Sequence, residues 1–456
     1  MPVAAPRALA FETLRETFER GAHTELAFRA GAEGLGLTGR DRAQAQRLAY
    51  GSVQRRGTAD AAIERLSGRA MRRLDPPVVA ALRLGLYELL FADATPDHAA
   101  VDQAVELVKI AEAAHASGFV NAILRRAARE RGELTAALLG DDSTPEAAAV
   151  AHSAPLWLAR MWWEELGADA ARAMLAACNE PAEVTMRAAD VPARADLVAR
   201  LRGEGIDVSP AVGDWPLAVP ETMVFAGRVG DSVPRLVAAG MLTPQSRGSA
   251  AVVEVLEPRA GETVLDLCAG PGIKTGQIAM RMEDRGEVIS VELDKARAAE
   301  ISAQVRRLDL HGVTVFEGDA TSLPLPEGFD RVLLDPPCSD LGTLASRPDA
   351  RWRKSPRTIE RVAAVQEKAL LGAAKVLRPG GTLVYSTCTI SRRENEDRVA
   401  ALLEAAAAGQ VPPLRLDDLG ALAPSLASPH EPRTLQLRPD RDRTTGFFIS
   451  RLTRHD

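Results

Sequence analysis

The sequence predicts an α/β protein, with a doubly wound, Rossmann-like catalytic domain preceded by an all-helical domain and a small α+β domain. From residue 241 onward, short apolar runs alternate with longer amphipathic segments, which is typical of a parallel sheet with helices on both faces. Residues 11–131 instead carry apolar side chains at helical spacing. A length of 456 residues leaves room for two or three domains.

The first domain is expected to span residues 1–140 and to be built of helices. Leu82 and Leu86 recur at helical spacing in an Ala- and Leu-rich stretch. Asp75-Pro76-Pro77 marks a helix start, because proline is tolerated in the first helical turn. The glycines and the acidic turn within residues 131–148 indicate a domain boundary.

The rest of the chain is predicted to hold a small α+β domain over residues 150–240 and the catalytic domain over residues 241–456. In the small domain we expect helices near 155–165 and 168–179 and strands near 183–188 and 206–209. In the catalytic domain we expect strands at 263–267, 287–291, 313–317, 330–334 and 382–386, helices at 295–308 and 359–377, an irregular excursion at 405–431, and a final antiparallel strand at 447–449.

Composition excludes several classes of protein. Hydrophobic residues make up 46% of the chain, which indicates a soluble, folded protein. No apolar run approaches the roughly 18 residues that a membrane span needs, and the N-terminus lacks a signal-peptide layout, so we expect a cytoplasmic protein with no membrane partner. Four cysteines without a CxxC pair predict neither a disulfide framework nor a metal site.

A glycine-bearing turn follows the first strand of the predicted catalytic sheet. The turn is neither a dinucleotide fingerprint, since Thr275 stands at the third glycine position, nor a P-loop, since Cys268 and Ile273 stand where glycines belong. Its glycines allow the backbone to approach a ligand, and the following helix offers its N-terminal amides. The residues expected to contact a cofactor here are Cys268, Ala269, Gly270, Pro271, Gly272 and Lys274.

An acidic residue follows each of the next two strands. Glu292 comes 22 residues after Gly270 and can accept hydrogen bonds from both hydroxyls of a ribose. Asp319 could accept a hydrogen bond from the amino group of an adenine. An acidic residue after each of two successive strands is better explained by a nucleoside-binding pocket than by solvent-exposed loops. Together with the glycine-bearing turn, these acids suit S-adenosylmethionine as the cofactor.

Two cysteines, 50 positions apart, each lie just past a predicted strand end. Cys338 follows Asp335-Pro336-Pro337, and Cys388 follows Ser386-Thr387. Methylation of cytosine at carbon 5 requires a thiolate that adds to carbon 6, a carboxylate that shares a proton with the base, and a base that removes the carbon 5 proton. Cys388, Asp335 and Cys338 supply these groups, although a free thiol is only a few per cent thiolate at neutral pH. We interpret Cys268 and Cys178 as small packed side chains.

The catalytic half resembles the Sun family of RNA cytosine-5 methyltransferases, through CAGPGIKT, DPPCS and STCT over most of residues 241–450. The resemblance implies that Cys388 is the nucleophile, that Cys338 assists product release, and that Asp335 binds the base. Lys274 then serves both the catalytic and the cofactor site, and Asp335 also borders the cofactor. Three residues depart from the family pattern: Ile273 replaces a glycine, Gln245 lies in a segment that lacks an acidic residue, and Thr445 replaces an aspartate.

The N-terminal half resembles the helical RNA-binding domain of NusB, through VDQAVELVK and GFVNAILRR. In the Sun family a NusB-like domain is characteristic of a subgroup that acts on 16S rRNA, so we expect small-subunit rRNA, free or in an early assembly intermediate, as the partner of a monomeric enzyme. The net charge of −6 argues against RNA binding unless local basic stretches supply the phosphate contacts. Arg347, Arg351 and Trp352 are the predicted RNA contacts beside the active site.

Two alternatives remain open. Asp335-Pro336-Pro337 is similar to the motif of amino-group methyltransferases, which place an aromatic residue where Cys338 stands and do not need Cys388. The second alternative is a non-catalytic, NusB-like RNA-binding factor whose methyltransferase half is only structural. Retention of the cysteines, Asp335 and Lys274 in one chain makes this alternative weaker.

Overall fold

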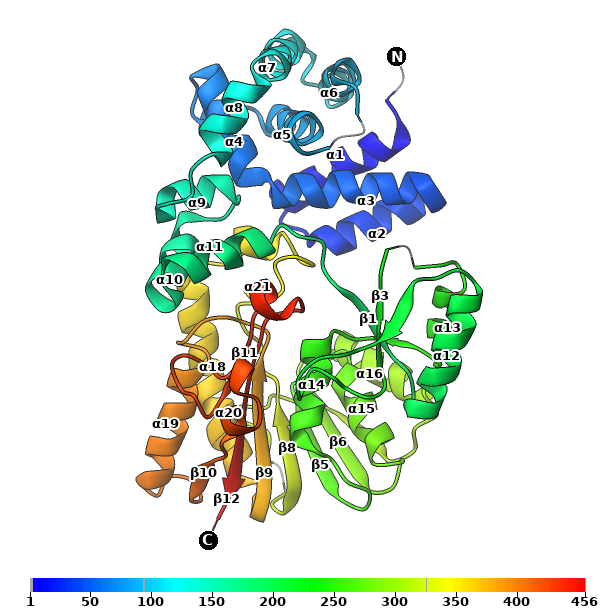
Figure 1. Ribbon diagram of the computed structural model, residues 1–456, viewed down its shortest axis with the longest axis vertical. Helices are drawn as coiled ribbons and strands as arrows, with labels where there is room; N and C mark the ends of the chain where they lie inside the picture. Colours follow the sequence, from blue (N-terminus) through cyan, green and yellow to red (C-terminus); the bar gives the residue numbers. More distant parts are fainter. Residues whose placement is uncertain (1–2, 93–94, 228, 325, 456) are drawn as a thin grey trace. The chain divides into compact units, whose positions relative to one another are not determined.

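The chain forms two compact units (Figure 1). The computed structural model describes residues 3–92, 95–227, 229–324 and 326–455. The helical unit comprises Met1–Glu180 and Leu344–Arg353, and the sheet unit comprises Pro181–Thr343 and Lys354–Asp456. The first division therefore falls after Glu180, beyond the boundary expected at residues 131–148.

The helical unit contains no strand in the part of the chain that the structure describes. Its helices are α1 (Ala5–Phe18), α2 (Thr24–Gly34), α3 (Gly39–Gln54), α4 (Arg56–Ser67), η1 (Met71–Arg73), α5 (Pro76–Phe91), α6 (Asp97–Ile110), η2 (Ala114–Ala116), α7 (Ser117–Arg129), α8 (Arg131–Leu139), α9 (Pro145–Ala151), α10 (Leu156–Leu166), α11 (Ala168–Ala177) and α17 (Ala350–Arg353).

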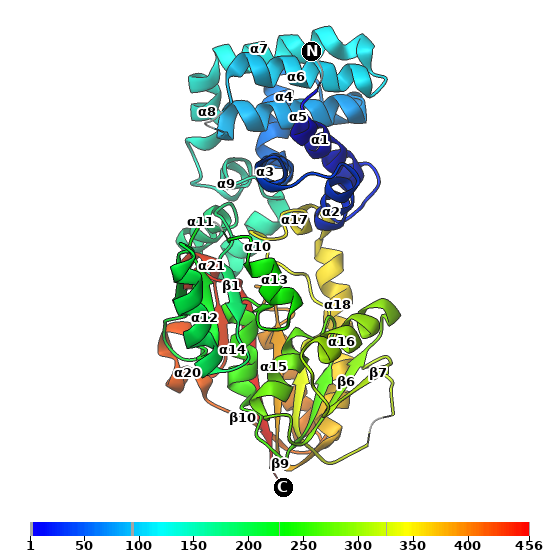
Figure 2. The same ribbon diagram turned by 90° about the vertical axis from the view of Figure 1, so that its right-hand side faces the viewer.

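Helix α5 lies at the centre of the core of this unit. It begins at Pro76, as the sequence predicts, and it buries Leu82 and Leu86 completely. Helices α5, α6 and α7 pack against one another, and they lie side by side in both views (Figures 1 and 2). The stretch expected to hold a domain boundary forms α8 and α9, because Leu134, Leu138 and Ala148 bury their side chains.

The sheet unit begins with a small antiparallel sheet of strand order β2-β3-β1-β4. Its elements are β1 (Val184–Arg187), α12 (Val191–Gly203), β2 (Val208–Pro210), β3 (Thr222–Phe225), α13 (Val233–Ala238) and β4 (Thr243–Pro244). The strands β1 and β2 lie close to the predicted strands, whereas β3, β4, α12 and α13 are absent from the sequence prediction. The predicted helices near 155–165 and 168–179 exist as α10 and α11, but they belong to the helical unit.

The larger sheet has the order β10-β12-β9-β8-β5-β6-β7, with β11 paired to β12. The elements of this layer are α14 (Arg247–Leu256), β5 (Thr263–Leu267), α15 (Ile273–Arg281), β6 (Glu287–Glu292), α16 (Lys295–Arg307), β7 (Val313–Glu317), β8 (Phe329–Leu334), α18 (Pro356–Lys375), β9 (Leu377–Thr387), α19 (Glu396–Ala407), β10 (Leu414–Leu416), α20 (Leu419–Leu422), η3 (Pro424–Leu426), β11 (Leu435–Leu437), α21 (Pro439–Asp442) and β12 (Phe447–Arg454).

Strands β5 to β9 are parallel to their neighbours, and β12 runs antiparallel to β9, so the doubly wound fold class is confirmed. The final antiparallel strand is also confirmed and extends to Arg454. The stretch 405–431 is more regular than expected, since α19 continues into it and β10 pairs with β12. Among the described residues, no helix combines the length and apolarity that crossing a membrane requires.

The two faces of the larger sheet bury alternate residues of the same strands. Val264, Leu333 and Val384 pack on the side of α14 and α15, whereas Leu334 and Tyr385 pack on the side of α18 and α19. Successive side chains of a strand point to opposite faces, so a strand covered on both sides reads as a continuous apolar run. This is why the sequence locates these strands so closely.

Candidate active site

The chain changes direction across the sheet between β5 and β8. From β5 it continues to β6 and β7 on one side, and it then returns to β8 and β9 on the other. In open parallel sheets this point opens a crevice at the carboxyl ends of the strands, where ligands bind. Lys274 lies in the first turn of α15 after β5, Asp335 directly follows β8, and Cys388 directly follows β9. The topology therefore brings the predicted catalytic residues to one edge.

Lys274 and Asp335 form a close ion pair, with Lys274 Nζ 2.5 Å from Asp335 Oδ2. Ser386 Oγ donates to the other carboxylate oxygen at 3.2 Å, and Lys274 Nζ lies 5.3 Å from the centre of the Phe447 ring. Burial lowers the pKa of Lys274, but the charge of Asp335 and its hydrogen bond outweigh burial, so this pKa is raised overall. Lys274 is thus a fixed ammonium that orients the carboxylate of Asp335.

The two predicted thiols lie side by side, with 3.3 Å between Cys338 Sγ and Cys388 Sγ. Cys338 is buried, whereas Cys388 is partly exposed. The hydrogen bond to Cys388 raises the pKa of Cys338 well above its ordinary value, and burial and the nearby acidic groups add to the shift. Cys338 therefore holds its proton at neutral pH, and Cys388 is the more accessible sulfur of the pair.

Asp340 contacts both sulfurs and was not predicted from the sequence. Its Oδ1 lies 3.3 Å from Cys388 Sγ and 3.8 Å from Cys338 Sγ, and its Oδ2 lies 2.7 Å from Lys354 Nζ. The two sulfurs and this carboxylate offer ligand atoms within 4.8 Å of one another, a spacing that a metal ion could bridge. The ammonium of Lys354 already neutralises the carboxylate, which disfavours a cation there.

Two glycines hold the loops that carry the thiols against each other. Gly342 N donates to the carbonyl oxygen of Cys388 at 2.9 Å, and Gly446 N donates to the carbonyl oxygen of Gly342 at 2.8 Å. A Cβ at Gly342 would lie only 2.2 Å from Gly446 O, so the approach requires glycine. The loop after β8, the end of β9 and the start of β12 are thereby fixed together.

Glu394 braces the same loop from the buried side. It accepts hydrogen bonds from Ser339 N at 2.8 Å, from Ser339 Oγ and from Gln366 Nε2 at 3.2 Å. Burial raises the pKa of Glu394, although these donors oppose the shift. Gln366 also donates to Pro337 O at 3.0 Å, so each residue flanking Cys338 is held by a buried side chain.

The predicted cofactor loop, residues 268–272, connects β5 to α15. Gly270 N donates to Glu292 Oε2 at 2.9 Å, and a Cβ at Gly270 would lie 2.5 Å from that oxygen. Gly272 adopts a left-handed conformation with φ of 91° where α15 begins. The loop therefore lies directly against the acid that follows β6. Each carboxylate oxygen of Glu292 accepts one backbone N–H, the second from Asp294 at 3.0 Å, and still has a lone pair for a ligand hydroxyl.

The other predicted cofactor residues lie within this loop or at the end of β7. Asp319 follows β7 and accepts hydrogen bonds from Thr321 N and Thr321 Oγ1, which lower its pKa and keep it ionised. Ala269 N is held by Val291 O at 3.0 Å, and Pro271 is exposed. Burial raises the pKa of Cys268, so that thiol stays neutral, as expected of a packed side chain. A loop free of side-chain bulk with an acid at each of the next two strand ends fits a nucleoside cofactor.

The three departures from the family pattern are accommodated locally. Gln245 Oε1 accepts from Arg187 Nε at 2.8 Å, and Thr445 Oγ1 donates to Ser246 Oγ at 2.7 Å. Ile273 is half-buried as the first residue of α15. None of these three residues makes a hydrogen bond to the thiols or to Asp335 among the described contacts.

The predicted RNA contacts lie in the segment Leu344–Arg353 of the helical unit. Arg347 is exposed, but the side chain of Arg351 is only 1% exposed. Its guanidinium donates to the oxygens of Ser153, Cys178, Asn179 and Leu344. Trp352 Nε1 donates to Val53 O at 2.8 Å. The RNA contact expected for Arg351 is therefore corrected to packing within the helical unit, whereas Trp352 is partly exposed and Arg347 is exposed, so the contacts expected for these two stay predictions.

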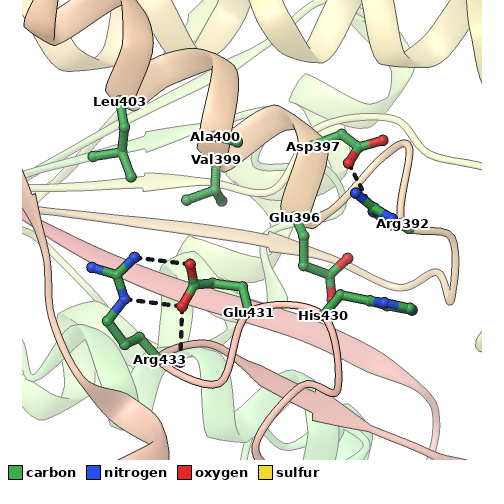
Figure 3. Close-up of a pocket in the computed structure, with 9 residues that line it drawn as sticks. All are labelled: Arg392, Glu396, Asp397, Val399, Ala400, Leu403, His430, Glu431 and Arg433. Atoms are coloured by element: carbon green, nitrogen blue, oxygen red, sulfur yellow. Dashed lines mark hydrogen bonds and ion pairs between the residues drawn. The ribbon is translucent and has the colours of Figure 1, made fainter.

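A separate surface pocket of about 320 Å³ lies beside α19 (Figure 3). Its charged side chains pair with each other: Arg433 lies 2.8 Å from Glu431, and Arg392 lies 3.0 Å from Asp397. None of the predicted site residues lines it. Glu396, which also lines the pocket, instead accepts a hydrogen bond from Ser428 Oγ.

Comparisons with known proteins agree with this arrangement. The family described as 16S rRNA methyltransferase RsmB/F matches residues 253–453, and the NusB family matches residues 4–129. A probable ribosomal RNA small subunit methyltransferase B of Synechocystis sp. is 31% identical to the chain over 98% of both proteins. One of Bacillus subtilis is also 31% identical over 98% of both. The chain belongs to the RsmB-type family of rRNA methyltransferases.

Solved structures extend the likeness to the whole fold. The crystal structure of PH0851 is 25% identical and matches 99% of both chains with a TM-score of 0.81. The crystal structure described as NSun6 from Pyrococcus horikoshii with SFG is 23% identical, covers 66% of this chain and 98% of its own, and has a TM-score of 0.58, which supports the fold alone. The fold of this chain is thus shared with PH0851 over nearly the full length.

Proposed function

We propose that this RsmB-type enzyme transfers a methyl group from S-adenosylmethionine to carbon 5 of a cytosine in 16S rRNA through a covalent bond between Cys388 and carbon 6. The observation that carries the proposal is the pair of sulfurs 3.3 Å apart, next to the Lys274–Asp335 ion pair. S-adenosylmethionine supplies an electrophilic methyl group on a sulfonium. Names of relatives that refer to small-subunit rRNA support the choice of substrate.

Each residue of the site would have a separate role in the reaction. Asp335, oriented by Lys274 and Ser386, would bind the N3 side of the cytosine and share a proton with it while carbon 6 is attacked. Cys388, the partly exposed thiol, would form the bond to carbon 6. Cys338, buried beside it, would assist product release, in which the carbon 5 proton is lost to solvent and Cys388 leaves carbon 6. The target cytosine must leave its stack to reach this edge.

The loop of residues 268–272, Glu292 and Asp319 would hold the cofactor. Glu292 has acceptor capacity for the ribose hydroxyls, and Asp319 would accept from the adenine amino group. Lys274 is paired with Asp335 at 2.5 Å. Its role in cofactor binding would therefore be indirect: it would hold the Asp335 carboxylate, which borders the cofactor site. Isothermal titration with S-adenosylhomocysteine should show binding that Glu292→Gln weakens by at least tenfold, since each charge-assisted hydrogen bond contributes about 1.5–3 kcal/mol.

Two cysteine variants test the proposal with unmodified 16S rRNA and labelled cofactor. Cys388→Ala should abolish methyl transfer, because it removes the proposed nucleophile. Cys338→Ala should leave a protein–RNA adduct that survives a denaturing gel. Full activity of Cys388→Ala would favour amino-group methylation instead, and absence of cofactor binding in the unaltered chain would favour a non-catalytic RNA-binding factor.

A further inference from the structure

Asp340 is the carboxylate in direct contact with the candidate nucleophile. We propose that Asp340 takes the proton of the Cys388 thiol as the sulfur bonds to carbon 6, and returns it when the sulfur leaves. This inference rests on the proposed function and deepens it, because neither the family motifs quoted above nor the sequence prediction gives Asp340 a part in the reaction.

The two oxygens of Asp340 have separate partners. Oδ1 faces the thiols and is closer to Cys388 Sγ, at 3.3 Å, than to Cys338 Sγ, at 3.8 Å. Oδ2 pairs with Lys354 Nζ at 2.7 Å, and that ammonium also donates to Cys338 O at 3.3 Å. Lys354 therefore fixes the carboxylate through one oxygen, while the other oxygen contacts the reacting sulfur.

The backbone of Asp340 is held in an unfavourable conformation. Its φ is 59°, in the left-handed region that few residues other than glycine adopt, although aspartate tolerates it better than most. Thr343 N and Thr343 Oγ1 both donate to Asp340 O, at 3.0 and 2.8 Å, and keep the turn closed. Strain of this kind persists where the surroundings impose it, and it occurs often at functional sites.

Lys274 and Cys338, two titratable groups that interact with Cys388, are poor proton acceptors. The charge of Cys388 acts on Lys274, but Lys274 is an ammonium already paired with Asp335 at 2.5 Å. Cys338 holds its own proton, since its pKa is raised by its hydrogen bond to Cys388 and by burial. Because a cysteine thiol is only a few per cent thiolate at neutral pH, an adjacent acceptor increases the reacting fraction.

The proposed step is balanced within the site. The S–H bond of Cys388 breaks as the S–C6 bond forms, its proton moves to Asp340 Oδ1, and the electron pair of the C5–C6 double bond becomes available at carbon 5. After methylation, the carbon 5 proton passes to solvent, the electron pair of its C–H bond restores the C5–C6 double bond, and the electron pair of the S–C6 bond returns to sulfur. The departing sulfur then recovers the proton from Asp340, which returns to the carboxylate form.

The test must separate loss of the acceptor from the change in charge. Asp340→Asn alone leaves the Lys354 ammonium beside the sulfurs, which would itself lower the pKa of the thiol. The double variant Asp340→Asn/Lys354→Met removes both charges of the pair and keeps the net charge, whereas Lys354→Met keeps the acceptor. Asp309→Asn is the matched control, because Asp309 is also left-handed, with φ of 53°, and its side chain is 95% exposed.

All variants are made in full-length chain carrying Cys338→Ala, and adduct formation with 16S rRNA is followed in single turnovers from pH 6 to 9.5. The double variant should form adduct about 10²-fold more slowly at pH 7, the size expected for a lost general base. Its rate should rise about tenfold per pH unit and approach the parent rate above the ordinary thiol pKa of about 8.5. Lys354→Met keeps the acceptor but loses the ammonium that positions it, so its rate at pH 7 should lie between those of the parent and of the double variant.

Equal rates and pH profiles for the double variant and the parent would overturn the proposal. A loss that is the same at every pH would also overturn it, since that result indicates a structural role. If the Cys338→Ala parent itself formed no adduct, the proposed function would be wrong. The parent is measured before Asp340 is altered, so this failure is distinguished from failure of the Asp340 proposal. Circular dichroism of each variant checks that the chain is folded, and Asp309→Asn should match the parent throughout.

Discussion

Replacement of Gly342 by alanine tests whether the close approach of three loops sets the position of the thiols. The added Cβ would lie 2.2 Å from Gly446 O, 2.7 Å from its carbonyl carbon and 2.8 Å from its Cα, all of them backbone atoms that cannot rotate away. Relief requires the loops to separate by about 1 Å, given that real contacts start near 3.0–3.4 Å. That movement would stretch the hydrogen bonds between Gly342 and both Cys388 O and Gly446 N.

The expected cost follows from these contacts. Overpacking of this kind costs about 1–3 kcal/mol, and one weakened backbone hydrogen bond adds about 1 kcal/mol, so Gly342→Ala should lose about 2–4 kcal/mol in the free energy of unfolding. A 1 Å displacement of Cys338 relative to Cys388 should slow methyl transfer by about 10²-fold. Urea unfolding followed by circular dichroism and single-turnover methylation of 16S rRNA measure the two effects.

Gly372→Ala is the matched control. Gly372 lies within α18, where a Cβ would meet only Ala320 O at an ordinary 3.6 Å, so alanine should stabilise the helix by up to about 1 kcal/mol without affecting the rate. If Gly342→Ala had the stability and rate of the unaltered chain, the proposed positioning of the thiols by Gly342 and Gly446 would be wrong.

Two further predictions concern buried charges. Burial raises the pKa of Asp266 to about 7, so between about pH 4 and 7 the folded chain holds a proton that the unfolded chain releases, and stability falls as pH rises. Relative to Asp266→Asn, the unaltered chain should thus lose roughly 2 kcal/mol in the free energy of unfolding between pH 5 and 7, and a constant difference across urea titrations would contradict the shift. Arg351→Lys should lose about 2–4 kcal/mol in the stability of the helical unit, because an ammonium cannot reach all of the oxygens that the guanidinium bridges. Unchanged unfolding together with weakened binding of 16S rRNA in a filter-binding assay would instead restore Arg351 as an RNA contact.

Strands of the larger sheet could be predicted closely because their signal is local. Thr263–Leu267 and Val313–Glu317 have the predicted bounds, since each is a short run of β-type residues ended by a turn. The same logic located Asp335, Cys338 and Cys388, because parallel strands place their carboxyl ends at one edge and the residues that follow those ends must meet.

Features that depend on distant partners could not be predicted. Asp340 carries no motif of its own, and its importance depends on Cys388 and Lys354, which are 48 and 14 positions away. Arg351 lies in a basic stretch, and a charge run normally indicates a solvated surface. Only the structure shows that three of its four acceptors lie some 170 to 200 residues earlier in the chain. A buried arginine has no distinct local pattern.

The insertion of Leu344–Arg353 into the helical unit affects how the protein can be divided. The chain passes from one unit to the other at Glu180, again at Thr343 and once more at Arg353. A truncation that begins at Pro181 would retain Arg351 and Trp352 but delete Ser153, Cys178 and Val53, whose oxygens accept their hydrogen bonds. The two units are consequently not interchangeable modules. If the helical unit were replaced by another RNA-binding domain, this ten-residue insert would have to be replaced with it. This requirement favours inheritance of the two units together.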